Sequence, residues 1–189
     1  LGIPDSRSSL IREKKFVKWL DTIKVDAHSI YLLGDLFDFW FEYKTVVPKG
    51  FTRVLGKIAE IADSGIPIYF FTGNHDMWVR DYFQLELGVK VITEPQQFKI
   101  NEKSFFIGHG DGLGPGDTSY KLMKKFITGN KFFKWCFRWV HPDIGVKLGQ
   151  FLSKEKKLMS AKKDIGDVEN QWLTPVSYTH LRAHETHLN

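Results

Sequence analysis

The chain has 189 residues, of which 42% are hydrophobic and 15% aromatic, a globular composition that excludes disordered, collagen-like and disulfide-scaffold proteins. It has no run of the roughly 18 to 20 apolar residues that a membrane span needs, and no signal sequence opens it. The single cysteine, Cys136, cannot form an internal disulfide. These features predict a cytoplasmic location.

The spacing of apolar residues changes repeatedly along the first 110 positions. Helical spacing alternates with short apolar runs that are bounded by turn residues. The predicted helices cover residues 9–24, 52–62 and 81–87. The predicted strands cover residues 29–33, 66–71, 90–93, 97–100 and 104–107. Strands that alternate with helices indicate an α/β fold.

Beyond residue 117 the sequence changes in pattern and in charge. Residues 118–173 contain helical stretches and no convincing strand, and we expect breaks at Gly129–Asn130, His141–Pro142 and Gly145. This segment holds 12 basic against 5 acidic residues, a net charge of +7, whereas residues 1–117 hold 14 against 16, or −2. We therefore predict a core of residues 1–117 followed by a basic helical cap.

Residues 174–189 differ from the rest of the chain. They contain three of the seven histidines, in a polar run that has neither helical nor strand periodicity. A metal-binding tail is one interpretation. However, Val176–Thr186 looks like one reading frame of a common sequencing adapter. We therefore interpret residues 174–189 as a cloning artefact and leave them out of the fold prediction.

Polar clusters directly follow three of the predicted strands. They are Gly-Asp-Leu-Phe-Asp at 34–38, Gly-Asn-His-Asp at 73–76 and Gly-His-Gly-Asp at 108–111. Because the carboxyl ends of strands converge in open α/β sheets, we expect these clusters to be neighbours in space. The glycine before each polar residue allows a sharp turn and the close approach of a metal ion or a phosphate.

The three clusters together offer carboxylate, amide and imidazole groups, a ligand set suited to Mn, Fe, Zn and related divalent ions. Two such ions about 3.5 to 4 Å apart would clamp a phosphoryl group. Taken singly, Asp35 and Asn74 could be turn residues and His109 a hydrogen-bonded core histidine. Their shared position at strand ends favours the metal site. Asp38 could support either the loop or the metal.

In this order and spacing, the clusters resemble the calcineurin-like metallophosphoesterases, over residues 1–173. The aromatic residues after Gly-Asp-Leu-Phe-Asp, and Asp117 followed by Tyr120, are most similar to the UDP-2,3-diacylglucosamine diphosphatase family. The resemblance implies an α/β/β/α sandwich, incomplete in this chain, with a helical cap insertion. It also implies two divalent metal ions, with Mn²⁺ favoured, and a UDP-linked acylated glucosamine as substrate.

The resemblance also implies a role for individual residues. Asp35 would bridge both metal ions, and Asn74 and His109 would be ligands of the second ion. His75 would lie beside the leaving oxygen, where it could donate a proton or stabilise charge, with Asp76 orienting it. The positions that match substrate contacts are Asp117, Tyr120, Ser153 and Lys154.

Two motifs of the family are absent from this chain. The family begins with a strand carrying Asp-x-His, typically followed by Leu-Gly, and it ends with Gly-His-x-His. The chain starts at Leu1-Gly2 and has neither motif. We therefore expect the chain as given to bind metal poorly and to hydrolyse little substrate.

The cap interleaves lysines with aromatic residues over 121–139. Such a surface can meet lipid at a membrane interface or line an acyl-chain pocket. It could also be an internally packed cap, or a groove that stacks nucleic-acid bases. With the resemblance, we predict that the chain is a fragment of a metal-dependent hydrolase that cleaves UDP-2,3-diacylglucosamine to UMP and 2,3-diacylglucosamine 1-phosphate in lipid A biosynthesis. We expect the intact enzyme to act at the inner membrane, without a nucleic-acid partner. The rival hypotheses are another phosphodiesterase or nuclease of the superfamily, and a noncatalytic membrane or nucleic-acid binding module.

Overall fold

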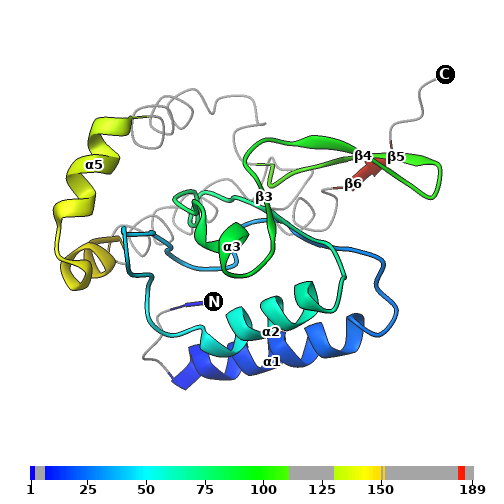
Figure 1. Cartoon of the computed structure of the whole chain (residues 1–189), viewed down its shortest axis with the longest axis horizontal. Helices are drawn as coiled ribbons and strands as arrows, with labels where there is room; N and C mark the ends of the chain where they lie inside the picture. Colours follow the sequence, from blue (N-terminus) through cyan, green and yellow to red (C-terminus); the bar gives the residue numbers. More distant parts are fainter. Residues whose placement is uncertain (3–6, 111–129, 150, 152–182, 186–189) are drawn as a thin grey trace, which may run out of the picture.

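The helices and strands predicted over residues 9–107 are present, with small shifts at their ends. The computed structural model describes residues 1–2, 7–110, 130–149, 151 and 183–185 (Figure 1). Its named helices are α1 (Arg7–Ile23), α2 (Thr52–Asp63), α3 (Tyr82–Leu85) and α5 (Lys131–Trp139). Its strands are β1 (Ile30–Leu32), β2 (Ile68–Phe71), β3 (Lys90–Ile92), β4 (Gln96–Ile100), β5 (Lys103–Ile107) and β6 (Ala183–Glu185).

The first sheet is parallel, with its strands in the order β1-β2-β3. In its register Tyr31 lies opposite Tyr69, which in turn lies opposite Lys90. Helix α2 connects β1 to β2, as parallel pairing of consecutive strands requires. Both faces of such a sheet are covered, which explains why its strands are apolar almost throughout.

One face of the parallel sheet packs against helices. Ile30 and Leu32 of β1, with Ile68 and Phe70 of β2, belong to the main core together with buried residues of α1, α2 and α3. In Figure 1, α1 and α2 run side by side beneath the strands. This layer is the helical face of the fold.

The opposite face of the parallel sheet packs against a second, antiparallel sheet with the order β4-β5-β6. The rings of Tyr31 and Tyr69 stack with their centroids 4.9 Å apart. Phe98 of β4 meets both rings edge-on, at 5.2 and 5.4 Å. Helices, parallel sheet and antiparallel sheet therefore form successive layers. The predicted α/β class is confirmed, and the layers agree with an incomplete α/β/β/α sandwich.

A glutamate of α1 caps the neighbouring helix α2. The N-cap residue of α2, Phe51, has φ 55° and makes no side-chain capping bond. Instead, Glu13 Oε1 accepts the backbone N–H groups of Arg53 and Val54, at 3.0 and 3.3 Å. Glu13 is buried, so this carboxylate belongs to the interface between the two helices.

Two of the three breaks expected in the cap fit the structure. Helix α5 begins directly after Asn130, whose Oδ1 accepts the Phe132 N–H at 2.9 Å, and a new helical stretch begins at Pro142. The break expected at Gly145 is wrong, because residues 142–149 form a continuous helix. A Cβ on Gly145 would overlap the hydroxyl of Tyr43. This glycine therefore serves close packing.

Of residues 174–189, the structure describes Ala183–Glu185, which form β6 and pair antiparallel with β5. The assignment of this tail to an adapter stays a prediction. Within the described ranges, no helix combines the length and apolarity needed to cross a bilayer.

Candidate metal centre

Three loops that follow strands meet around Asp35. Asp35 follows β1, His75 follows β2 and His109 follows β5. His109 Nε2 lies 3.3 Å from Asp35 Oδ2, and the backbone N–H of His75 donates to Asp35 Oδ1 at 3.1 Å. The strand ends thus bring together one residue from each of the three predicted clusters.

Glycines allow the loops to approach this closely. A Cβ on Gly73 would overlap Asp35 Oδ1, and a Cβ on Gly34 would lie 2.6 Å from His109 Nδ1. Gly34 and Asp35 also have positive φ angles, of 80° and 53°. This conformation costs a residue with a side chain about 1 kcal/mol. The strained turn after β1 places the Asp35 carboxylate beside the ring of His109 and the backbone N–H of His75.

A backbone carbonyl orients the ring of His109. Its Nδ1 lies 2.7 Å from the Leu33 oxygen, and because a carbonyl only accepts, Nδ1 carries a hydrogen. In the neutral ring, Nε2 then presents its lone pair to the Asp35 carboxylate. Two acceptors at this distance need a proton or a metal cation to hold them together. The pair therefore fits a divalent ion, because a ligating histidine is commonly fixed through its other nitrogen.

Asp35 is ionised at neutral pH. Burial raises the pKa of this carboxyl, but when no metal ion is bound and the His109 ring is protonated, the hydrogen bond and positive charge of that ring, with the N–H of His75, outweigh burial and bring the pKa below its ordinary value. Asp35 can therefore serve as a carboxylate ligand without first losing a proton.

Asp76 links the second loop to the first. It is fully buried, and its two oxygens accept the N–H groups of Gly73 at 2.6 Å and Leu36 at 2.9 Å. Burial, reinforced by the nearby charge of Asp35, raises the pKa of Asp76 to about 6, against the opposing effect of the backbone hydrogen bonds. Asp76 thus braces the loops behind the site.

The ring of His75 is held by a different residue from the one that we expected. Its Nδ1 lies 3.0 Å from the backbone oxygen of Asp38, whereas the sequence suggested that Asp76 would orient it. The Asp38 N–H in turn donates to the Leu1 oxygen at 2.8 Å. Asp38 therefore supports the loop through its backbone.

The other predicted site residues are placed less fully. Asn74 is half-buried in the loop between Gly73 and His75, where its amide oxygen would complete a ligand set with Asp35 and His109. Within the described part of the chain, no three His, Cys, Asp or Glu side chains form a metal-binding group. The predicted substrate contacts lie outside the described residues; they are Asp117, Tyr120, Ser153 and Lys154.

The sequence did not reveal the backbone oxygens of Leu33 and Asp38 as the groups that orient the two histidines. Main-chain acceptors leave no residue-type signal. The signal that was present is the glycine before each cluster, because a glycine at a strand end marks a close backbone approach.

Known proteins similar to this chain share one name. A UDP-2,3-diacylglucosamine hydrolase of Porphyromonas gingivalis is 37% identical over 197 residues, covering 97% of this chain and 75% of that protein. Proteins of the same name from Histophilus somni and Actinobacillus succinogenes are 29% and 30% identical, over 79% and 71% of the chain. The chain spans 63% and 57% of those two relatives' lengths, less than two thirds. No family model matches the chain.

The resemblance that the three motifs indicate is confirmed by these relatives. Identity of 37% across nearly the whole chain agrees with the layered α/β fold and with the meeting of the motif loops at Asp35. The chain therefore belongs to the UDP-2,3-diacylglucosamine hydrolase family.

Proposed function

We propose that the whole protein hydrolyses the phosphoanhydride bond of UDP-2,3-diacylglucosamine to UMP and 2,3-diacylglucosamine 1-phosphate, a step of lipid A biosynthesis. The observation that carries the proposal is the contact of Asp35 with His75 and His109 at the ends of three strands. The names of the relatives support the choice of substrate.

The site would work with two divalent metal ions, and we favour Mn²⁺. Asp35, Asn74 and His109 would hold them, and the ions would supply Lewis-acid charge to the phosphoryl oxygens. The Leu33 carbonyl keeps the hydrogen of His109 on Nδ1, so that Nε2 is the ligating atom. The backbone N–H of His75, which donates to Asp35 Oδ1, favours the charged carboxylate.

His75 is our candidate for the residue that acts on the leaving phosphate oxygen. Its backbone N–H is fixed to Asp35 and its Nδ1 to the Asp38 oxygen. A proton delivered to the leaving oxygen would therefore come from Nε2 of the imidazolium form. The same ring could instead stabilise the developing negative charge.

We also propose that the protein is cytoplasmic and acts while peripherally bound to the inner membrane, with no nucleic-acid partner. Helix α5 supports the membrane location, because Phe132, Trp135 and Trp139 are 70%, 56% and 77% exposed. Basic residues stand between these aromatics along the helix. Tryptophan and basic side chains suit the headgroup region of a bilayer.

The first prediction tests the site with Asp35→Ala in the whole protein, expressed from its full reading frame. We expect kcat/KM to fall by more than about 100-fold and Mn²⁺ affinity to fall with it, because even indirect supports of metal ligands contribute about 10- to 100-fold. UMP release and calorimetric Mn²⁺ titration measure the two effects. Asp63→Ala, at the exposed end of α2, should change neither.

The same assay separates the rival enzymes. The proposal expects hydrolysis of acylated UDP-glucosamine and little hydrolysis of the deacylated compound. Equal turnover of both, or preferred turnover of a simple phosphodiester or nucleic acid, would point to another activity. Full turnover by Asp35→Ala would contradict the site assignment.

A further inference from the structure

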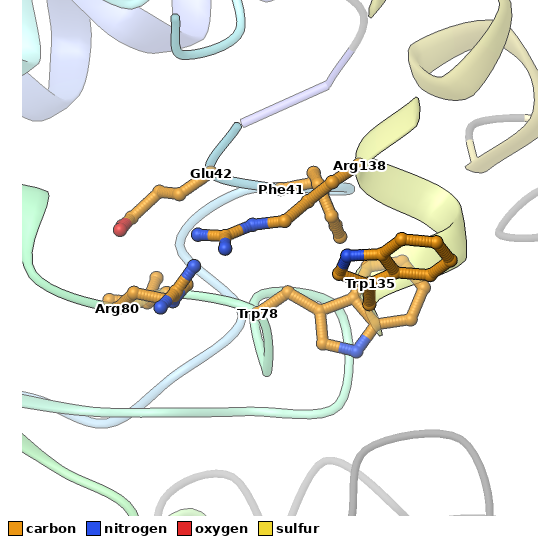
Figure 2. Close-up of a pocket in the computed structure, with 7 residues that line it drawn as sticks. Phe41, Glu42, Trp78, Arg80, Trp135 and Arg138 are labelled. Atoms are coloured by element: carbon orange, nitrogen blue, oxygen red, sulfur yellow. The ribbon is translucent and has the colours of Figure 1, made fainter. Parts of the chain in front are cut away.

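A cavity of about 390 Å³ lies between the core and α5, outside the metal centre. Its wall combines aromatic and charged side chains. Those that matter here are Phe41, Glu42, Trp78, Arg80, Trp135 and Arg138. Figure 2 shows the guanidinium groups of Arg80, from the loop before α3, and of Arg138, from α5, pointing into the same space.

The charges in this wall favour an anion. Within the described ranges 7–110 and 130–149, no acidic side chain forms an ion pair with Arg80 or Arg138. Glu42 is the acidic residue of the wall, and it is 2% exposed. Its oxygens accept the Trp40 Nε1–H at 3.1 Å and the Tyr82 N–H at 3.2 Å. Two arginines against one glutamate leave a net charge of +1.

The aromatic part of the wall extends from the core to the exposed face of α5. Phe41 and Trp78 pack edge to face, with centroids 5.1 Å apart. Trp135 lines the cavity and also contacts its exposed neighbours Phe132 and Trp139, with centroids 6.1 and 6.0 Å away. The cationic cavity is therefore continuous with an exposed aromatic strip.

We propose that this cavity binds the phosphate of a membrane phospholipid, between the guanidinium groups of Arg80 and Arg138. A guanidinium donates two parallel hydrogen bonds to a phosphate, and tryptophan favours the depth of lipid headgroups. A free phosphate would use the arginines but not the aromatic wall, so the wall favours a lipid. The inference rests on the proposed membrane location and concerns a site separate from the Asp35–His109 pair.

The test replaces both arginines by lysine, Arg80→Lys with Arg138→Lys, which keeps the charge but removes the guanidinium fork. Binding is measured with the whole protein, without substrate, on vesicles of phosphatidylglycerol and of phosphatidylcholine. Soluble dihexanoyl phosphatidylglycerol, glycerol phosphate and inorganic phosphate are titrated by calorimetry. We expect the double variant to bind both forms of phosphatidylglycerol at least about tenfold more weakly than wild type.

Arg53→Lys, exposed on α2, is the matched control and should bind like wild type. Circular dichroism checks that each variant is folded.

Each outcome decides one part of the proposal. Equal lipid binding by wild type and the double lysine variant would overturn the phosphate site and leave the membrane location standing. Binding of free phosphate or glycerol phosphate as tight as that of the soluble lipid would overturn the lipid as occupant. A wild-type protein that binds no vesicle would overturn both the lipid site and the membrane location. The hydrolase proposal is tested separately, by UMP release.

Discussion

Gly73 determines how closely the loop after β2 can approach Asp35. Any Cβ at this position would overlap a carboxylate oxygen of Asp35, and that same oxygen accepts the N–H of His75. The second prediction is that Gly73→Ala displaces Asp35 from His109. We expect it to weaken Mn²⁺ binding and to lower the free energy of unfolding by about 1 to 3 kcal/mol, the usual cost of overpacking.

A glycine elsewhere in the chain provides the matched control for that change. Gly56 lies in α2, and a Cβ there would meet nothing within 4 Å. Gly56→Ala should therefore raise the free energy of unfolding by up to about 1 kcal/mol, through helix propensity alone. Urea titrations of both variants measure the two effects. Effects of the same sign would show that the contact at Gly73 is not what limits the substitution.

Residue types predicted which groups meet at the site, because a glycine followed by a polar residue at a strand end has a recognisable pattern. They did not predict how the groups are held. The sequence suggested that Asp76 would orient His75, yet in the structure Asp76 accepts from the backbone of Gly73 and Leu36. Any segment can supply main-chain partners, so their identity emerges only once the loops are folded together.

Helix α2 depends on its neighbour for its first turn. Phe51 cannot cap the helix, and Glu13 of α1 accepts two of the first N–H groups instead.

The third prediction is that Glu13→Ala lowers the free energy of unfolding by about 1 to 3 kcal/mol, because buried donors lose their acceptor. Glu13→Gln should cost less, since the amide oxygen can still accept. Urea denaturation measures both, with Glu94→Ala at an exposed position as the neutral control. An equal loss for Gln and Ala would contradict the capping role.

At the scale of elements, periodicity predicted the helices and strands but not their tertiary contacts. A glutamate between apolar positions of α1 suggests a solvated residue, yet Glu13 is buried beside α2. Gly145 suggested a helix break, yet the helix continues there and packs against Tyr43. In both cases a contact with a neighbouring element outweighed the local preference of the segment. The sequence of a single segment does not encode such a contact.

At the scale of the whole molecule, the described part of the proposed cap packs on the core through Phe137 of α5 and through Gly145, which lies against Tyr43. Phe137 is 8% exposed, and its ring lies 4.5 Å from that of Phe41 and 5.2 Å from that of Trp78. Phe41 follows the loop of Asp35, and Trp78 follows the loop of His75. The cap is therefore packed on the segments that directly follow two of the site loops, while the core clusters of the sheets lie elsewhere.

The last prediction follows from this division. Phe137→Ala should release the cap without unfolding the sheets, because the lost contacts join α5 to the loops and not the strands to one another. Amide hydrogen exchange over residues 131–149 should accelerate at least about tenfold, the effect of losing about 1.4 kcal/mol of local stability, while β1 and β2 exchange as in wild type. Phe132→Ala removes an equal ring from the exposed face of the same helix and should leave exchange in the cap unchanged. Faster exchange throughout the sheets would mean that cap and core unfold as one unit. An equal effect of both variants would contradict the anchoring role of Phe137.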